Sequence, residues 1–222
     1  MTKPFRDRTE AGRVLADALS HYAGRDDVLV LALPRGGVPV AYEVARALDA
    51  PLDVFVVRKL GVPGHEELAM GAIASGGVRV LNEEVVRPLG IPRAVIDQVT
   101  RLEMRELQRR EELYRGNRPR ADVRGKTVIL IDDGLATGST MHAAAAALRQ
   151  LRPERLVVAV PTAAPDTCDA FRSVVDEVVC ATTPQPFHAV GAWYEDFSQT
   201  TDDEVREYLA AANSRHVTAA SG

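Results

Sequence analysis

The segment that decides the fold reads KTVILIDDGLATGST, residues 126–140. It begins with β-forming residues, Thr127 to Ile131, and two acids, Asp132 and Asp133, follow directly. Small and hydroxyl residues then lead into an alanine-rich stretch, which predicts a helix that begins near Ser139. A buried strand, a polar turn and a helix in this order are typical of one unit of a parallel sheet, with the acids at the carboxyl end of the strand.

The rest of the chain repeats this alternation. Continuous apolar runs are typical of strands buried on both faces, and they occur at residues 27–34, 52–57, 155–161 and 176–180. Apolar residues at helical spacing separate these runs and predict helices at residues 9–22, 36–48, 139–151, 165–174 and from Thr201 onward. The sequence therefore predicts an α/β fold: a mostly parallel, doubly wound sheet with helices on both faces.

Several local features accompany this pattern. Thr9 is the expected N-cap of the first helix, and a hairpin is expected around Gly76 and Gly77. Residues 92–114 predict one long, charged helix with Pro92 in its first turn. Within it, Glu106 with Arg110, and Glu111 with Arg115, are spaced to form ion pairs. The two cysteines, Cys168 and Cys180, lie too far apart for a Cys-x-x-Cys site and are expected to be buried thiols.

The domain organisation follows from the same reading. We expect one domain over residues 1–222, with a core at about 26–181, a small hood built from 1–25 and 182–213, and a disordered tail at 214–222. The net charge of -4 argues against nucleic acid as a partner. No apolar run is long enough to span a membrane, and the charged N-terminus lacks a secretory signal. These features predict a cytoplasmic protein.

The residues after the two acids are suited to bind phosphate. Free N–H groups at a helix N-terminus attract anions, Gly138 allows close approach, and the hydroxyls of Thr137, Ser139 and Thr140 add donors. The carboxylates would repel a phosphate, but they suit vicinal hydroxyls or a hard cation beside it. Paired acids also occur in ordinary turns, and hydroxyl residues are ordinary helix caps. Their combination directly after a buried strand favours a ribose 5-phosphate site.

Residues 128–140, VILIDDGLATGST, resemble the ribose-phosphate-binding signature of the type I phosphoribosyltransferases. That resemblance implies a transferase of nucleotide metabolism that uses phosphoribosyl pyrophosphate (PRPP) and Mg²⁺. Asp132 and Asp133 would hold the ribose hydroxyls and the metal ion, the latter directly or through water. The implied PRPP-binding residues are Pro34, Arg35, Gly36, Gly37, Asp132, Asp133, Gly134, Ala136, Thr137, Gly138, Ser139 and Thr140.

The family also implies two loops outside the signature. Pro34 to Gly37 would bind pyrophosphate through backbone N–H groups, and Arg35 would add charge. A mobile loop after the second core strand would close over the reaction centre, carry Arg58 and Lys59, and take its freedom from Gly61 and Gly64. The implied catalytic residues are Arg35, Arg58, Lys59, Asp132 and Asp133.

The acceptor of the ribosyl group is less well defined by the sequence. Phe187, Trp193, Tyr194 and Phe197 crowd into a short stretch of the hood and are expected to stack on a planar nucleobase. Ala136 stands where some purine-specific members have an acid, which argues against hypoxanthine or guanine. We therefore expect an unspecified nitrogen nucleophile as acceptor and, by resemblance, a homodimer. The alternative is a regulator that senses PRPP or a nucleotide, and the predicted closing loop favours the enzyme.

Overall fold

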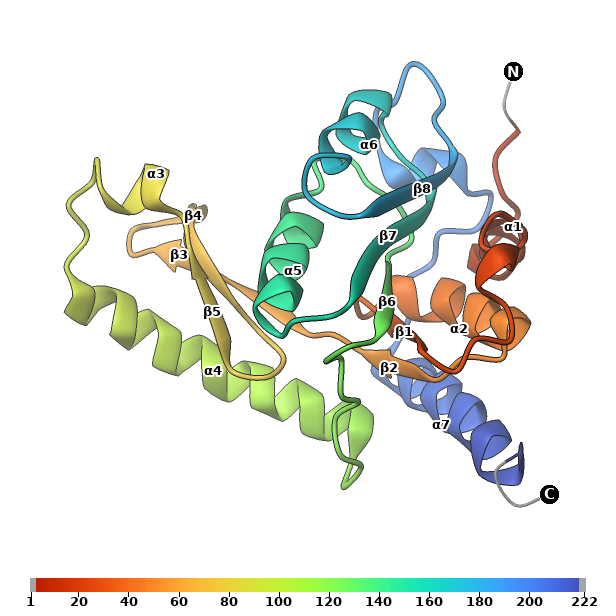
Figure 1. Ribbon diagram of the computed structural model, residues 1–222. Coiled ribbons are helices and arrows are strands. Elements are labelled where there is room, and N and C mark those ends of the chain that lie inside the picture. Colours follow the sequence, from red (N-terminus) through yellow and green to blue (C-terminus); the bar gives the residue numbers. More distant parts are fainter. Residues whose placement is uncertain (1–2, 220–222) are drawn as a thin grey trace.

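The computed structural model describes residues 3–219, and a parallel sheet lies at its centre (Figure 1). The strand order is β2-β1-β6-β7-β8, and every neighbouring pair is parallel. The strands are β1 (Val28–Ala32), β2 (Leu52–Val54), β6 (Thr127–Ile131), β7 (Arg155–Thr162) and β8 (Glu177–Thr182). This confirms the predicted α/β class with a mostly parallel sheet. Strands β1 and β6 pair at the centre, so their carboxyl ends lie side by side.

Helices cover both faces of this sheet, as alternate strand residues require. Alternate side chains such as Val30 and Ile129 pack in one apolar cluster with helices α1, α2 and α7, whereas Leu31 and Leu130 pack in another with α5 and α6. The helices are α1 (Arg8–Ala18), α2 (Gly37–Leu48), α5 (Ser139–Gln150), α6 (Pro165–Phe171) and α7 (Asp202–Ala219). Both faces of the central strands are therefore buried.

A second, antiparallel sheet projects from the core beside the long helix α4 (Arg93–Arg115) (Figure 1). Its strands are β3 (Val57–Val62), β4 (His65–Ala74) and β5 (Val78–Leu81), and the short helix α3 (Glu83–Val86) follows. The hairpin expected around Gly76 and Gly77 is present. The prediction that Arg58 and Lys59 lie in a loop was wrong. Both residues lie within β3, where they pair with Ile73 and Ala72 of β4.

Helix α4 agrees with the expected long, charged helix, except that Pro92 is its N-cap and precedes its first turn. The two expected ion pairs are present: Arg110 Nε lies 2.8 Å from Glu106, and Arg115 Nη1 lies 2.6 Å from Glu111. Arg115 also pairs with the buried Asp53 of β2 at 2.8 Å. The C-terminal end of α4 is thereby fixed to the edge strand of the main sheet.

Residues near the N-terminus meet the segment that precedes α7 over the carboxyl edge of the sheet. Phe5 forms a parallel β-bridge with Tyr194, next to the short helix η2 (Val190–Trp193); the other short helix, η1 (Ser20–Tyr22), follows α1. The N-cap of α1 is Asp7, whose carboxylate accepts from the Glu10 N–H at 2.7 Å, so the expectation for Thr9 was wrong.

The C-terminal helix α7 begins after a reciprocal cap, in which Thr201 and Glu204 hydrogen-bond to each other. It continues to Ala219, so the expected tail at 214–222 is helical over the part that the structure describes. Residues 220–222 lie outside the described residues. Within residues 3–219, no helix has the length and apolar character needed to cross a membrane.

Candidate active site

The two acids of the signature leave β6 side by side, and each has one oxygen engaged by the protein. The Asp133 N–H donates to Asp132 Oδ1 at 2.8 Å. Arg8, the first residue of α1, donates from Nε and Nη2 to Asp133 Oδ2, at 2.9 and 2.8 Å. Within residues 3–219, no group hydrogen-bonds to the remaining oxygens, Asp132 Oδ2 and Asp133 Oδ1. The pair therefore retains one free acceptor on each carboxylate, as vicinal hydroxyls require.

The electrostatics of the pair are unequal. Burial and the neighbouring charge of Asp133 raise the pKa of Asp132 well above its usual value. Burial also raises the pKa of Asp133, but the guanidinium of Arg8 opposes that shift. Arg8 thus favours the ionised form of Asp133, while Asp132 binds a proton more readily than an exposed aspartate. A hydroxyl or cation that approaches Asp132 would favour its ionised form.

Gly36 and Gly37 lie against the acids, which explains why this turn contains glycine. A Cβ atom on Gly36 would lie 2.1 Å from Asp133 Oδ2, and one on Gly37 would lie 2.8 Å from the Ile131 carbonyl oxygen. Both are far inside ordinary van der Waals contact. The turn from Pro34 to Gly37 and the acid pair therefore belong to one site, as the strand order implies. The peptide bond between Pro34 and Arg35 is cis.

The loop after the acids has the form expected of an anion cradle. Gly138 has a left-handed φ of 69° and serves as N-cap of α5 without a side-chain cap, so the first N–H groups of the helix remain available. Thr137, Ser139 and Thr140 are exposed at this end. Lys59 Nζ donates to Ser139 Oγ at 2.9 Å and places a positive charge beside the cradle.

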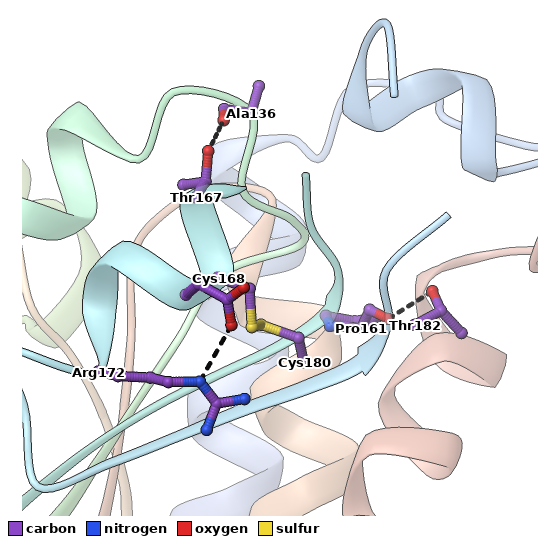
Figure 2. The surroundings of a disulfide bond; sticks show 8 residues. Ala136, Pro161, Thr167, Cys168, Arg172, Cys180 and Thr182 are labelled. Carbon is purple, nitrogen blue, oxygen red and sulfur yellow. Dashed lines mark hydrogen bonds and ion pairs between the residues drawn. A yellow bond between two sulfur atoms is a disulfide. The ribbon is translucent and has the colours of Figure 1, made fainter. Parts of the chain in front are cut away.

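The loop is supported from below by helix α6. Thr167 Oγ1 donates to the Ala136 carbonyl oxygen at 2.7 Å (Figure 2). Phe171 of α6 lies so close that a Cβ on Gly138 would come within 2.7 Å of its ring. The ring of His142, on α5, stacks on the Phe171 ring, with the two centroids 3.9 Å apart.

The same helix carries a disulfide, which contradicts the expectation of two buried thiols. Cys168 of α6 is bonded to Cys180 of β8, with the Cα atoms 6.6 Å apart (Figure 2). Helix α6 leads through a short turn into β8 and packs back on it, which brings together two residues that the sequence separates by 12. The disulfide therefore fixes to the sheet the helix that supports the loop after the acids.

The basic residues of the site are distributed differently from the expectation. Lys59 lies at the cradle, but Arg58 points to α4, where its guanidinium pairs with Glu103 at 2.6 Å. Arg35 Nη1 lies 3.8 Å from Asp202 at the start of α7. A cavity of about 620 Å³ lies between the second sheet and α5, with Lys59, Thr137 and Ser139 among its lining residues. Space for a substrate-sized molecule is therefore available next to the cradle.

The hood aromatics are engaged with one another and with the acids. Tyr194 is only 6% exposed, and its hydroxyl donates to the Asp133 carbonyl oxygen at 2.6 Å. The Arg8 guanidinium lies over the Phe197 ring, 4.0 Å from its centroid. Phe187 and Trp193 are stacked with centroids 6.4 Å apart. Tyr194 thus supports the acid pair, and the stacking role expected for these aromatics stays a prediction.

Comparison with known proteins places this chain in a family. The family model described as "Phosphoribosyl transferase domain" matches residues 8–195. The chain belongs to that family. It is 50% identical over 211 residues to the Mycobacterium tuberculosis H37Rv protein named "Putative phosphoribosyl transferase Rv0571c", and this match covers 95% of the chain and 47% of the relative. The chain thus spans about half the length of the curated relatives it matches.

A solved structure resembles this phosphoribosyl transferase domain along almost its whole length. The protein TT1426 from Thermus thermophilus is 44% identical, with a TM-score of 0.83, and the match covers 94% of this chain and 98% of that one. The family assignment confirms the resemblance inferred from residues 128–140. It does not identify an acceptor.

Sequence reasoning missed Arg8, which this phosphoribosyl transferase domain pairs with Asp133. Arg8 and Asp133 are 125 residues apart, and nothing in the local pattern distinguishes Arg8 from Arg6 or Arg13. A signal existed only in the general rule that a buried carboxylate needs a partner. Within residues 3–219, no group of three or more His, Cys, Asp or Glu side chains could hold a metal ion by itself.

Proposed function

We propose that this domain transfers ribose 5-phosphate from PRPP to a nitrogen nucleophile, with a nucleobase as the expected acceptor, and releases pyrophosphate. The observation that carries the proposal is the acid pair. Asp132 and Asp133 each keep one free oxygen, directly beside an uncapped helix N-terminus. This places two hydroxyl acceptors next to a phosphate cradle, which is the combination that a ribose 5-phosphate presents.

The chemistry follows from what each residue could hold. Displacement of pyrophosphate builds positive charge on the ribose ring, which the two carboxylates would stabilise electrostatically. The loop from Pro34 to Gly37 packs against Asp133 and is positioned to bind the departing pyrophosphate. Lys59, which contacts Ser139, adds positive charge beside the 5-phosphate. Orientation and charge stabilisation, and not proton transfer, would supply most of the rate enhancement.

Mg²⁺ is part of this proposal. Two carboxylates with free oxygens fit Mg²⁺ when substrate oxygens complete its coordination, since this ion is commonly bound by one or two carboxylates plus phosphates. Asp132 and Asp133 are the residues that would hold it. When bound, it would neutralise charge on the diphosphate and so favour its departure.

The assembly and location are also proposed. Large apolar side chains are exposed on the projecting part of the molecule, including Leu89 at 55% and Leu102 at 56%. Their exposure supports a homodimer that covers this region. We propose a cytoplasmic location from the composition of the chain. In a reducing cytoplasm, the disulfide between Cys168 and Cys180 would be subject to reduction to two thiols.

A regulator that senses PRPP is the alternative, because it could use the same acids and cradle. The contact of Lys59 with Ser139 adds a side-chain charge beside the proposed 5-phosphate cradle, which would stabilise bound PRPP in either function. The two functions differ in whether an acceptor triggers release of pyrophosphate.

The test measures pyrophosphate release from PRPP with Mg²⁺ across a panel of nucleobases and small amines. The double variant Asp132→Asn, Asp133→Asn should lose all release, while Asp166→Asn, an exposed acid on α6, should retain it. Release that depends on one acceptor would establish the transferase and name its substrate. Saturable PRPP binding without release for any acceptor would favour the regulator. Absence of both would refute the ribose 5-phosphate site.

A further inference from the structure

The disulfide between Cys168 and Cys180 borders a cavity of this domain. The cavity measures about 350 Å³, and both cysteines are among its lining residues. Cys168 is buried on α6, whereas Cys180 is partly exposed on β8, which is an edge strand of the main sheet. A small thiol therefore has room to approach the Cys180 sulfur while the domain stays folded.

Helix α6 depends on this bond more than a longer helix would. It has only seven residues, and helices of that length are marginal by themselves in water. Its buried residues are Cys168 and Phe171, so the cross-link to β8 and the packing of Phe171 hold it against the sheet. Reduction of the disulfide would remove one of these two attachments.

The same helix holds the loop that follows the acids. Thr167, the neighbour of Cys168, donates to the Ala136 carbonyl oxygen at 2.7 Å (Figure 2). Phe171 lies against Gly138, where an added Cβ atom would come within 2.7 Å of its ring. Both contacts come from residues within one turn of Cys168. A change in the position of α6 would therefore reach the proposed phosphate cradle directly.

The proposed cytoplasmic location bears on this connection. Disulfides in that compartment are rare, and those that occur are usually transient and either catalytic or redox-sensing, because cellular thiols reduce them. We propose that the Cys168–Cys180 disulfide is a reversible site of thiol–disulfide exchange, and that its reduction releases α6 and loosens the loop at residues 136–140. The proposed function assigns this loop to phosphate, so the effect of reduction on ligand affinity rests on that function.

The exchange uses a small thiol as reductant. Its thiolate attacks the Cys180 sulfur, the S–S bond breaks, and Cys168 leaves as a thiolate that takes up a proton. A second thiol molecule then displaces the Cys180 sulfur from the mixed disulfide. Two electrons and two protons thus pass to the protein, and the two thiol molecules become one disulfide. Exchange with a small-molecule disulfide reverses both steps.

Hydrogen–deuterium exchange, measured before and after reduction by dithiothreitol, tests the loop without any ligand. Reduction should speed the exchange of residues 136–140 about threefold to tenfold, the effect of losing one hydrogen bond. Residues 75–78, the turn of the second sheet, are the reference. The double variant Cys168→Ser, Cys180→Ser should exchange at the faster rate and show no response to dithiothreitol, since the chain has no other cysteine.

Thr167→Val separates the two parts of the connection. It keeps the disulfide but removes the hydrogen bond to Ala136, so it should speed exchange of the loop in the oxidised state and diminish the further response to reduction. Access through the cavity has its own readout. The rate of reduction should not change at low urea concentrations, because attack on the folded state exposes no additional surface.

Calorimetric titration with ribose 5-phosphate then measures the consequence for binding. The reduced wild type and the double serine variant should both bind about threefold to tenfold more weakly than the oxidised wild type. Faster loop exchange with equal affinity in the two states would uphold the release of the loop and contradict its assignment to phosphate. Faster loop exchange without binding of ribose 5-phosphate or PRPP in either state would uphold the switch and refute the proposed function.

Three results would overturn the inference. The first is equal exchange of residues 136–140 in the two redox states, and the second is an equal acceleration at residues 75–78. The third is a disulfide that dithiothreitol reduces only as fast as the domain unfolds. Acceptor-dependent release of pyrophosphate that accompanied any of these would leave the proposed function standing without the switch.

Discussion

Replacement of Gly36 by alanine tests whether the proposed pyrophosphate loop and Asp133, the proposed ribose-binding acid, share one tightly packed site. Gly36 has φ -60° and ψ -33°, which alanine adopts without strain, so only the new methyl group matters. That group would lie 2.1 Å from Asp133 Oδ2 and 2.8 Å from its Cγ. The carboxylate must therefore retreat by about an ångström or more to reach ordinary contact. This displacement would disturb its 2.8 Å ion pair with Arg8.

Overpacking of this kind lowers the free energy of unfolding by about 1–3 kcal/mol. Loss of a hydrogen bond to a charged group adds about 1.5–3 kcal/mol to the free energy of PRPP binding, which is roughly a tenfold to hundredfold increase in Kd. Thermal unfolding and calorimetric titration with PRPP would measure the two effects. Gly77→Ala is the control: its Cβ meets nothing within 4 Å, and its positive φ predicts lower stability without lower affinity. A Gly36→Ala variant with wild-type stability and affinity would refute the reasoning.

Further expectations follow from the site. Arg8→Gln should weaken PRPP binding about tenfold by removing the partner of the ribose-side acid, and Arg13→Gln, on the same helix, should not; equal titration curves for both would contradict this. Gly138→Ala, at φ 69°, should destabilise the fold by about 1–2 kcal/mol and weaken ribose 5-phosphate as well as PRPP, as unfolding and titration would show. The raised pKa of Asp132 means that the folded state binds a proton at a pH where the unfolded chain releases it; this stabilisation is present below the usual pKa of 3.8 and is lost as the pH rises through the folded-state pKa. Asp132→Asn should therefore raise Tm at pH 8 and flatten its pH dependence while it abolishes PRPP binding, and an unchanged Tm profile would argue against the shift. Reduction of the disulfide should lower the free energy of unfolding by about 3 kcal/mol, and identical urea midpoints with and without dithiothreitol would exclude this.

The sequence predicted the parts of the site whose signals are local. The strand, the acids and the proposed phosphate cradle lie within residues 126–140. The repeated alternation of buried strands and helices along the chain predicts a mostly parallel sheet. A strand that ends in Asp132 and Asp133 and precedes a helix can place these acids at only one edge of a parallel sheet. Their position could therefore be derived without knowledge of the tertiary structure.

The parts that failed depend on contacts between distant segments. The disulfide requires that α6 packs back on β8, and the choice of Lys59 over Arg58 for the cradle depends on the pairing of β3 with β4. Strand pairing sends successive side chains to opposite faces, so a register fixed by distant residues decided which of two neighbouring cations met Ser139. Tyr194 was recognised as an aromatic of the hood, but its hydrogen bond to the Asp133 carbonyl was not foreseeable from spacing.

The contact of the N-terminal residues with the segment that precedes α7 has a consequence for the order in which the protein is made. Arg8 donates hydrogen bonds to Asp133 and to the carbonyl oxygen of Ser198, which lies 190 residues further along the chain. During synthesis the parallel sheet can form as its strands leave the ribosome, since domains fold from the N-terminal side as they emerge. Asp133 nevertheless acquires its complete environment only when Tyr194 and Ser198 have been added. A nascent chain halted after β8 would therefore have its sheet but not the complete set of contacts around Asp133.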